Sequence, residues 1–126
     1  MNDEISVVIA IGGKGTRLRS ISGEIPKPLY PIVGISTIER TLNELKIYKF
    51  KKIILTTCFK KELFTDFLTK SNKDFQNYFV FEENTPLGEC GALWKIKKQL
   101  SSKTIFINGD LIFSLDFNNL IAFHNR

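Results

Sequence analysis

The feature that most constrains the fold is a continuous apolar run, residues 5–11, that ends at Gly12 and Gly13. A run of this length bounded by glycines predicts a buried strand followed by a tight turn. Three further strands are predicted from short apolar or β-branched runs, at residues 53–57, 78–81 and 104–107. Apolar strands of this kind are typical of a sheet that is covered on both faces.

Amphipathic stretches separate these strands. Ser36 and Glu39 form a capping-box pattern before a helix that we expect to reach about residue 47. Further helices are predicted around residues 63–68 and at 89–100, and Asp116 is expected to cap a last helix. The alternation predicts an α/β fold, a Rossmann-like, mostly parallel sheet of about four strands flanked by helices. Because such a sheet is small, we expect residues 1–126 to be only the first part of a longer domain.

Composition narrows the class of protein. The chain has 126 residues, 43% hydrophobic and 25% charged, which fits one soluble globular core. The net charge of +5 suits an anionic ligand but does not choose between a nucleotide, a polynucleotide and an acidic membrane face. We interpret the scattered lysines as solvated, namely Lys49, Lys51, Lys52, Lys60, Lys61, Lys95, Lys97 and Lys98.

Several function classes are not indicated. Cys58 and Cys90 have no CxxC spacing, so neither a disulfide framework nor a zinc site is predicted, and Cys90 is expected to be a small core residue at a helix start. His124 is interpreted as a helix-end packing residue. The sequence carries no signal-peptide pattern and no membrane-spanning run, so we expect a cytoplasmic protein without a membrane partner. No basic stripe interleaved with aromatics is evident, so no nucleic-acid partner is expected either.

In open α/β sheets, ligands bind outside the carboxyl ends of the strands. The first predicted strand leads into Gly12-Gly13-Lys14-Gly15-Thr16-Arg17-Leu18. Glycines allow backbone N–H groups to approach phosphate oxygens, and the lysine and the arginine add positive charge. The loop matches neither the Walker A motif nor the dinucleotide fingerprint, which needs a glycine in place of Leu18. A simple turn therefore remains an alternative to a phosphate-binding loop.

Lys27 is the second candidate for contact with phosphate. It stands between Pro26 and Pro28, ten residues after Arg17. Because proline fixes its own φ and restricts the residue before it, this lysine would be held at a defined point. On its own, the tripeptide could equally be a stiff surface turn.

Taken together, these motifs resemble the sugar-1-phosphate nucleotidyltransferase family. The resemblance extends over essentially the whole chain and is carried, in order and spacing, by residues 12–18, 26–29, 86–88, 91–93 and 108–110. Residues 17–22 and 122–124 look most like bacterial members that make GDP-linked heptose or mannose. Members of the family join a nucleoside triphosphate to a sugar 1-phosphate and release pyrophosphate. The resemblance implies that residues 1–126 are the N-terminal nucleotide-binding part of a nucleotidyltransferase domain, and that the product would serve cell-surface polysaccharide or lipopolysaccharide precursors.

The resemblance also implies roles for particular residues. Arg17 would grip the triphosphate, Lys27 would lie on the phosphate at the reacting centre, and Asp110 would hold Mg²⁺. A second metal-binding aspartate of the family would lie further along than this sequence reaches. The alternative to an enzyme is a catalytically incomplete nucleotide-binding fragment or pseudoenzyme. The oligomeric state stays open, and a homo-oligomer is possible.

Glu83 bears on the choice of base. It stands five residues before Gly88, where uridylyl- and thymidylyl-transferring relatives usually carry glutamine. A carboxylate only accepts hydrogen bonds, and guanine presents two adjacent donors, so Glu83 would favour GTP. Alternatively, Glu83 is solvated and backbone groups near Gly12 and Gly88 contact the base.

Overall fold

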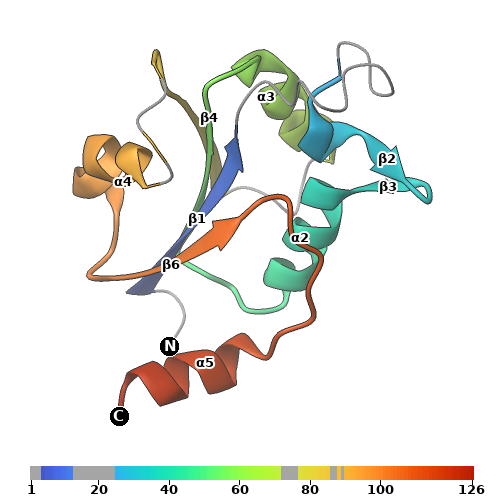
Figure 1. Ribbon diagram of the computed structural model, residues 1–126. Helices are drawn as coiled ribbons and strands as arrows, with labels where there is room; N and C mark the ends of the chain where they lie inside the picture. The colour runs from blue at the N-terminus through green and yellow to red at the C-terminus, as the bar shows by residue number, and fades with distance from the viewer. Residues whose placement is uncertain (1–3, 13–24, 72–76, 86–87, 89) are drawn as a thin grey trace.

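A computed structural model describes residues 4–12, 25–71, 77–85, 88 and 90–126. At its centre is a four-stranded sheet of β1 (Ile5–Gly12), β4 (Lys52–Thr57), β5 (Tyr78–Glu82) and β6 (Lys103–Asn108) (Figure 1). The strand order is β5-β4-β1-β6, and every pair is parallel. The predicted α/β class and parallel sheet are therefore confirmed. The chain steps outward from β1 to β5 and then crosses to β6 on the other side of β1, so the order reverses beside β1.

The four strands are not equally buried. β1 and β4 lie in the middle, and their apolar side chains are almost completely buried. β5 and β6 lie at the two edges among the described strands and are only partly buried, which corrects the expectation of four fully buried strands. Phe79 of β5, for example, is 47% exposed.

One face of the sheet carries most of the core. It is covered by α2 (Thr37–Lys46), α3 (Lys61–Ser71) and α5 (Phe117–His124), whose buried side chains include Leu42, Phe64 and Phe117. The opposite face is covered by α4 (Gly91–Ile96) and the 3₁₀ helix η5 (Lys97–Gln99), where Ile96 packs on Val8 and Ile54. Figure 1 shows α4 standing out alone on this second side of the sheet.

Two predicted helix starts are confirmed. The Ser36 Oγ accepts a hydrogen bond from the backbone N–H of Glu39 at 3.3 Å. The Oδ1 of Asp116 accepts one from the N–H of Asn119 at 3.1 Å, so Asp116 is the cap of α5. Both bonds satisfy N–H groups that the first turn of a helix leaves without a partner.

The helix predicted at residues 89–100 is wrong in its length. α4 ends at Ile96, and η5 and an extended Leu100 follow. Just after Leu100, the Ser6 Oγ accepts a hydrogen bond from the N–H of Ser101 and donates one to its Oγ, both at 2.9 Å, which ties the chain to the start of β1. Cys90 precedes α4 and is exposed, so its assignment to the core is also wrong.

The segment expected to be a loop up to Gly34 contains regular structure. η3 (Lys27–Leu29) is followed by a small antiparallel hairpin of β2 (Pro31–Ile32) and β3 (Ile35–Ser36). The two turn residues, Val33 and Gly34, have φ values of 55° and 81°. Both angles are left-handed, as a two-residue hairpin turn between right-twisted strands requires.

No helix among the described residues is long and apolar enough to cross a membrane. At the end of α5, His124 is exposed, so it does not pack against the core as expected.

Candidate nucleotide-binding site

The candidate residues that the structure describes are Gly12, Lys27, Glu83, Gly88 and Asp110. Gly12 ends β1, Glu83 follows β5 and Asp110 follows β6, so all three lie at the carboxyl ends of strands of the same parallel sheet, with β4 between β5 and β1. The remaining candidates, Gly13, Lys14, Gly15, Thr16 and Arg17, lie outside the described residues.

The ends of β1 and β6 are joined tightly. The N–H of Gly109 donates to the carbonyl oxygen of Ala10 at 2.8 Å. A Cβ at Gly109 would lie 2.8 Å from Ile11 Cγ2 and 2.9 Å from the Ala10 oxygen, closer than real Cβ contacts. The glycine is therefore required for this approach, and it fixes the residue after it, Asp110, at the point where the strand order reverses. In open α/β sheets this reversal is where ligands bind.

A bulge turns the end of β1. Ala10 pairs with Thr56 and Gly12 with Thr57, so Ile11 is an extra residue in the ladder. Gly12 has φ of 79°, a left-handed conformation that glycine adopts without strain. The Ile11 side chain points into the core on the α2 side. The bulge thus ends the regular pairing at the residue that begins the glycine-rich loop.

Thr57 and Cys58, at the end of β4, connect the end of β1 with the end of β5. The N–H of Cys58 donates to the carbonyl of Gly12 at 3.5 Å, and its Sγ lies 3.6 Å from the same oxygen. The N–H of Glu83 donates to the carbonyl of Thr57 at 2.7 Å. Thr56, Thr57 and Cys58 are not among the site residues predicted from the sequence. The only signal for them was that they stand at the end of a predicted strand.

Glu83 is half-buried, whereas its neighbour Glu82 is exposed. Its backbone bond to Thr57 continues the β4–β5 ladder by one residue, so the position of Glu83 is set by the sheet and not by a separate loop. Gly88 has φ of 82° and accepts a hydrogen bond from the N–H of Gly91 at 3.3 Å, which leads the chain into α4.

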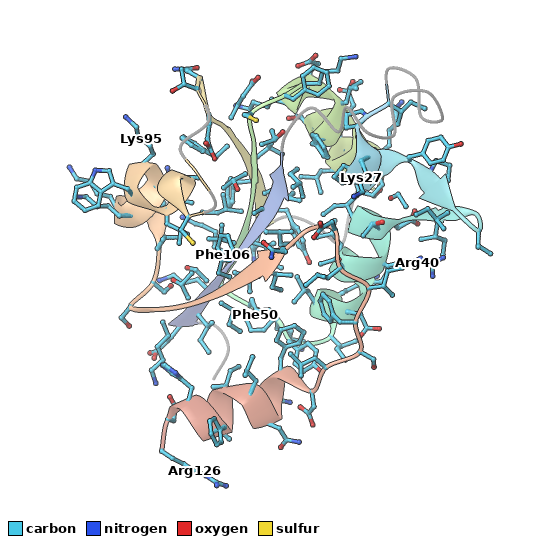
Figure 2. The ribbon with its side chains drawn as sticks, viewed as in Figure 1. Lys27, Arg40, Phe50, Lys95, Phe106 and Arg126 are labelled. Carbon is cyan, nitrogen blue, oxygen red and sulfur yellow. The ribbon has the colours of Figure 1, made fainter. Side chains whose placement is uncertain are left out.

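Lys27 is exposed, and the proline on each side of it is buried. The N–H groups of Leu29 and Tyr30 donate to the carbonyl of Pro26 at 2.9 and 3.1 Å, closing the turn around the lysine. η3 packs on α2, and Figure 2 shows Lys27 at the same end of the molecule as the tip of β1. The prolines therefore anchor the turn, as the sequence predicted, and leave the ammonium group accessible.

Asp110 would supply only part of a magnesium site. It is exposed, and the described residues contain no group of three His, Cys, Asp or Glu side chains that could hold a metal. Mg²⁺ is commonly bound by one or two carboxylates together with substrate phosphates and water. One carboxylate near the candidate phosphate-binding loop suits that mode of binding and would not suit a cage made of protein ligands alone.

The chain is similar in sequence to known proteins. The chain is 32% identical over 123 residues to the mannose-1-phosphate guanylyltransferase of Mycobacterium tuberculosis, covering 96% of this chain and 34% of that protein. It is 31% identical to the D-glycero-alpha-D-manno-heptose 1-phosphate guanylyltransferase of Campylobacter jejuni, covering 92% of this chain and 52% of that protein. This chain thus spans about half or less of these relatives.

Solved structures agree. HddC from Yersinia pseudotuberculosis, crystallised with GMP-PN, superposes with a TM-score of 0.79 and 38% identity over 93% of this chain and 52% of its own. A putative glucose-1-phosphate thymidylyltransferase from Bacillus anthracis shares the fold, with a TM-score of 0.83 at 22% identity, over 96% of this chain and 50% of its own. The nucleotidyl transferase family model matches residues 6–126. The chain therefore belongs to the nucleotidyl transferase family.

Proposed function

We propose that the protein transfers a nucleotidyl group from a nucleoside triphosphate to a sugar 1-phosphate, releasing pyrophosphate. The observation that supports this most is the Gly109–Ala10 hydrogen bond, because it ties the turn that carries Asp110 to the end of β1, where the glycine-rich loop begins. The guanylyltransferase relatives support the same reaction class. In this reaction the sugar phosphate oxygen attacks the α-phosphorus in line, so no covalent enzyme intermediate is needed.

The main contribution of the site residues would be to neutralise the negative charge of the phosphates. Arg17 would contact the triphosphate with its planar fork of donors, and Lys27 would place a compact charge on the reacting phosphate. Backbone N–H groups from Gly12 to Thr16 would orient the phosphates. Asp110 would hold Mg²⁺, which when bound would neutralise charge on the triphosphate.

We further propose GTP as the preferred nucleotide. Glu83 is half-buried and its backbone is part of the sheet, so its carboxylate would meet the base from a fixed position. Two acceptor oxygens match the N1–H and N2 amino donors of guanine. The guanylyltransferase relatives are consistent with this choice. The product would then be a GDP-sugar for cell-surface polysaccharide or lipopolysaccharide precursors.

A second candidate is nucleotide binding without turnover. It is favoured by one observation: the chain spans 34% and 52% of the two guanylyltransferase relatives, so about half or more of their length has no counterpart among these residues.

Pyrophosphate release from GTP separates the two candidates. The protein is incubated with GTP, Mg²⁺ and either mannose 1-phosphate or D-glycero-α-D-manno-heptose 1-phosphate. Release that depends on the sugar phosphate supports the transferase, and GTP binding with no release supports the second candidate. Arg17→Ala should lower turnover by about 10³ or more. An Arg17→Ala variant with unchanged turnover would exclude the assigned role, and Lys61→Ala on α3 is the matched control.

A further inference from the structure

Lysines and exposed aromatic rings gather on the face of the sheet opposite the main core. Trp94 on α4 is 71% exposed, and the Nζ of Lys97 lies 3.4 Å from the centre of its ring. The neighbouring Lys95 and Lys98 are exposed as well. Figure 2 shows Lys95 pointing outward from α4. We call Trp94, Lys95, Lys97 and Lys98 the α4 patch.

The patch continues onto the edge of the sheet. The Nζ of Lys52 donates to the carbonyl of Gln99 in η5 at 3.4 Å and also lies 5.4 Å from the centre of the Phe79 ring. Phe79 is partly exposed on β5. Lys52 thus links η5 to Phe79. The two exposed rings, Trp94 and Phe79, each have a lysine ammonium group over them.

The charge of the segment has one sign. From Cys90 to Gly109 the sequence contains four lysines and no aspartate or glutamate. Surface lysines are normally interspersed with acidic residues, and an exposed tryptophan is unusual on a surface that faces only water. The nucleotide site does not use these residues, because they lie on α4 and η5 and not at the strand ends.

We propose that the α4 patch docks the protein on an anionic lipid surface. Tryptophan prefers the boundary between headgroups and acyl chains, where its ring is buried and its N–H stays in a polar layer. Lysines beside it are attracted to anionic headgroups, each contributing about fivefold to partitioning. The sequence alone predicted solvated lysines and no membrane partner, and the exposure of Trp94 among them is what changes that prediction.

Two observations favour a lipid surface over other polyanions. Lys97 covers one face of the Trp94 ring, which leaves that face closed to stacking by a nucleic-acid base. In addition, the Trp94 side chain is 71% exposed, and an exposed tryptophan ring gains more from the boundary between headgroups and acyl chains than from an acidic peptide, which offers only charge.

Binding to vesicles tests the proposal directly. The protein is sedimented with vesicles of phosphatidylcholine and phosphatidylglycerol in equal parts and with phosphatidylcholine alone. We expect binding to the anionic vesicles only, weakened by added salt. Trp94 is the only tryptophan of the sequence, so its emission should shift to the blue on binding and be quenched by brominated lipid.

Charge-matched variants make the test specific. Lys95→Gln, Lys97→Gln and Lys98→Gln combined should weaken vesicle binding by about 100-fold, with pyrophosphate release unchanged. The control combines Lys49→Gln, Lys61→Gln and Lys70→Gln, which removes the same charge from exposed positions elsewhere.

Three outcomes would overturn the proposal. Equal losses in the two triple variants would mean that net charge alone attracts the protein. An emission of Trp94 that is unchanged by anionic vesicles would mean that the patch does not enter the lipid. Binding of a single-stranded oligonucleotide or a polyglutamate peptide through the patch, without binding of vesicles, would assign it to another polyanion.

Discussion

The N–H of Gly109 donates to the carbonyl oxygen of Ala10 at 2.8 Å, and the two strands lie so close there that residue 109 has no space for a side chain. Asn108 ends β6, so the turn that carries Asp110 begins in contact with the last regular residues of β1. The proposed metal ligand and the proposed phosphate loop therefore depend on one backbone contact. Changes at Gly109 should affect the site before they affect the rest of the fold.

Gly109→Ala should destabilise the protein and weaken its use of Mg²⁺. The new Cβ would clash with Ile11 Cγ2 and with the Ala10 oxygen, and the backbone atom cannot move aside cheaply. We expect a loss of about 1–3 kcal/mol in the free energy of unfolding, measured by urea denaturation. The Mg²⁺ concentration for half-maximal pyrophosphate release should rise. Ser114→Ala, exposed in the same connection, is the control. Wild-type behaviour of Gly109→Ala in both assays would contradict the contact.

Substitutions of the two aspartates after β6 should have different effects, one on activity and the other on stability. Asp110 is exposed and Asp116 caps α5 through its Oδ1. Asp110→Asn should lower turnover and raise the Mg²⁺ requirement, with a change in unfolding free energy within about 0.5 kcal/mol. Asp66→Asn, exposed on α3, removes the same charge as a control. If Asp110→Asn keeps the wild-type Mg²⁺ dependence, the proposed ligand is wrong.

Asp116→Ala should show the opposite behaviour. It removes the cap of α5 and should cost about 1 kcal/mol of unfolding free energy, with pyrophosphate release unchanged. Asp116→Asn keeps an acceptor for the N–H of Asn119 and should be close to wild type. Thermal unfolding of the three proteins provides the comparison. A loss of turnover in Asp116→Ala at full folding would instead place Asp116 in the site.

Glu83→Gln should reduce the preference for GTP over UTP. Glutamine keeps the size of the side chain but offers one acceptor and one donor group, so one contact with guanine is lost. A hydrogen bond to a charged group is worth roughly 1.5–3 kcal/mol, or about 10- to 100-fold in affinity. Calorimetric titration with both nucleotides measures the ratio. A parallel loss for GTP and UTP would show that Glu83 does not contact the base. Glu82→Gln, next to it and exposed, is the control.

Local sequence patterns predicted those parts of the fold that local forces determine. The Ser36 and Asp116 caps were predicted because a short polar side chain before an apolar stripe has a specific partner only a few residues away. The hairpin at residues 31–36 was missed because its turn places Val33, a β-branched residue, at φ of 55°. A pattern search expects Asn-Gly there.

Contacts between distant residues account for the other differences. Ser101, which follows α4 and η5, is hydrogen-bonded to Ser6, 95 residues before it, and no helix signal in the sequence records such a bond. The pairing of Thr57 with Glu83 and of Cys58 with Gly12 also follows from strand order, which periodicity does not give. The candidate site was therefore predictable as a set of strand ends, and the residues that join those ends were not.

Tyr78 should make stability fall at high pH. Burial raises the pKa of its hydroxyl from 10.0 to about 12. Below about pH 9 the tyrosine is neutral in both the folded and the unfolded chain, so its contribution to stability is constant there. Between pH 10 and 12 the unfolded chain releases the proton and the folded protein retains it, so unfolding becomes more favourable.

Tyr78→Phe isolates this effect, since lysines that titrate in the same range are present in both proteins. The ring packs against the main core and should stay in place. We expect the stability advantage of the wild type over Tyr78→Phe to shrink as the pH rises from 9 to about 12, measured by urea denaturation at each pH. If the two stability curves stay parallel through this range, the hydroxyl ionises equally in both states and burial does not hold its proton.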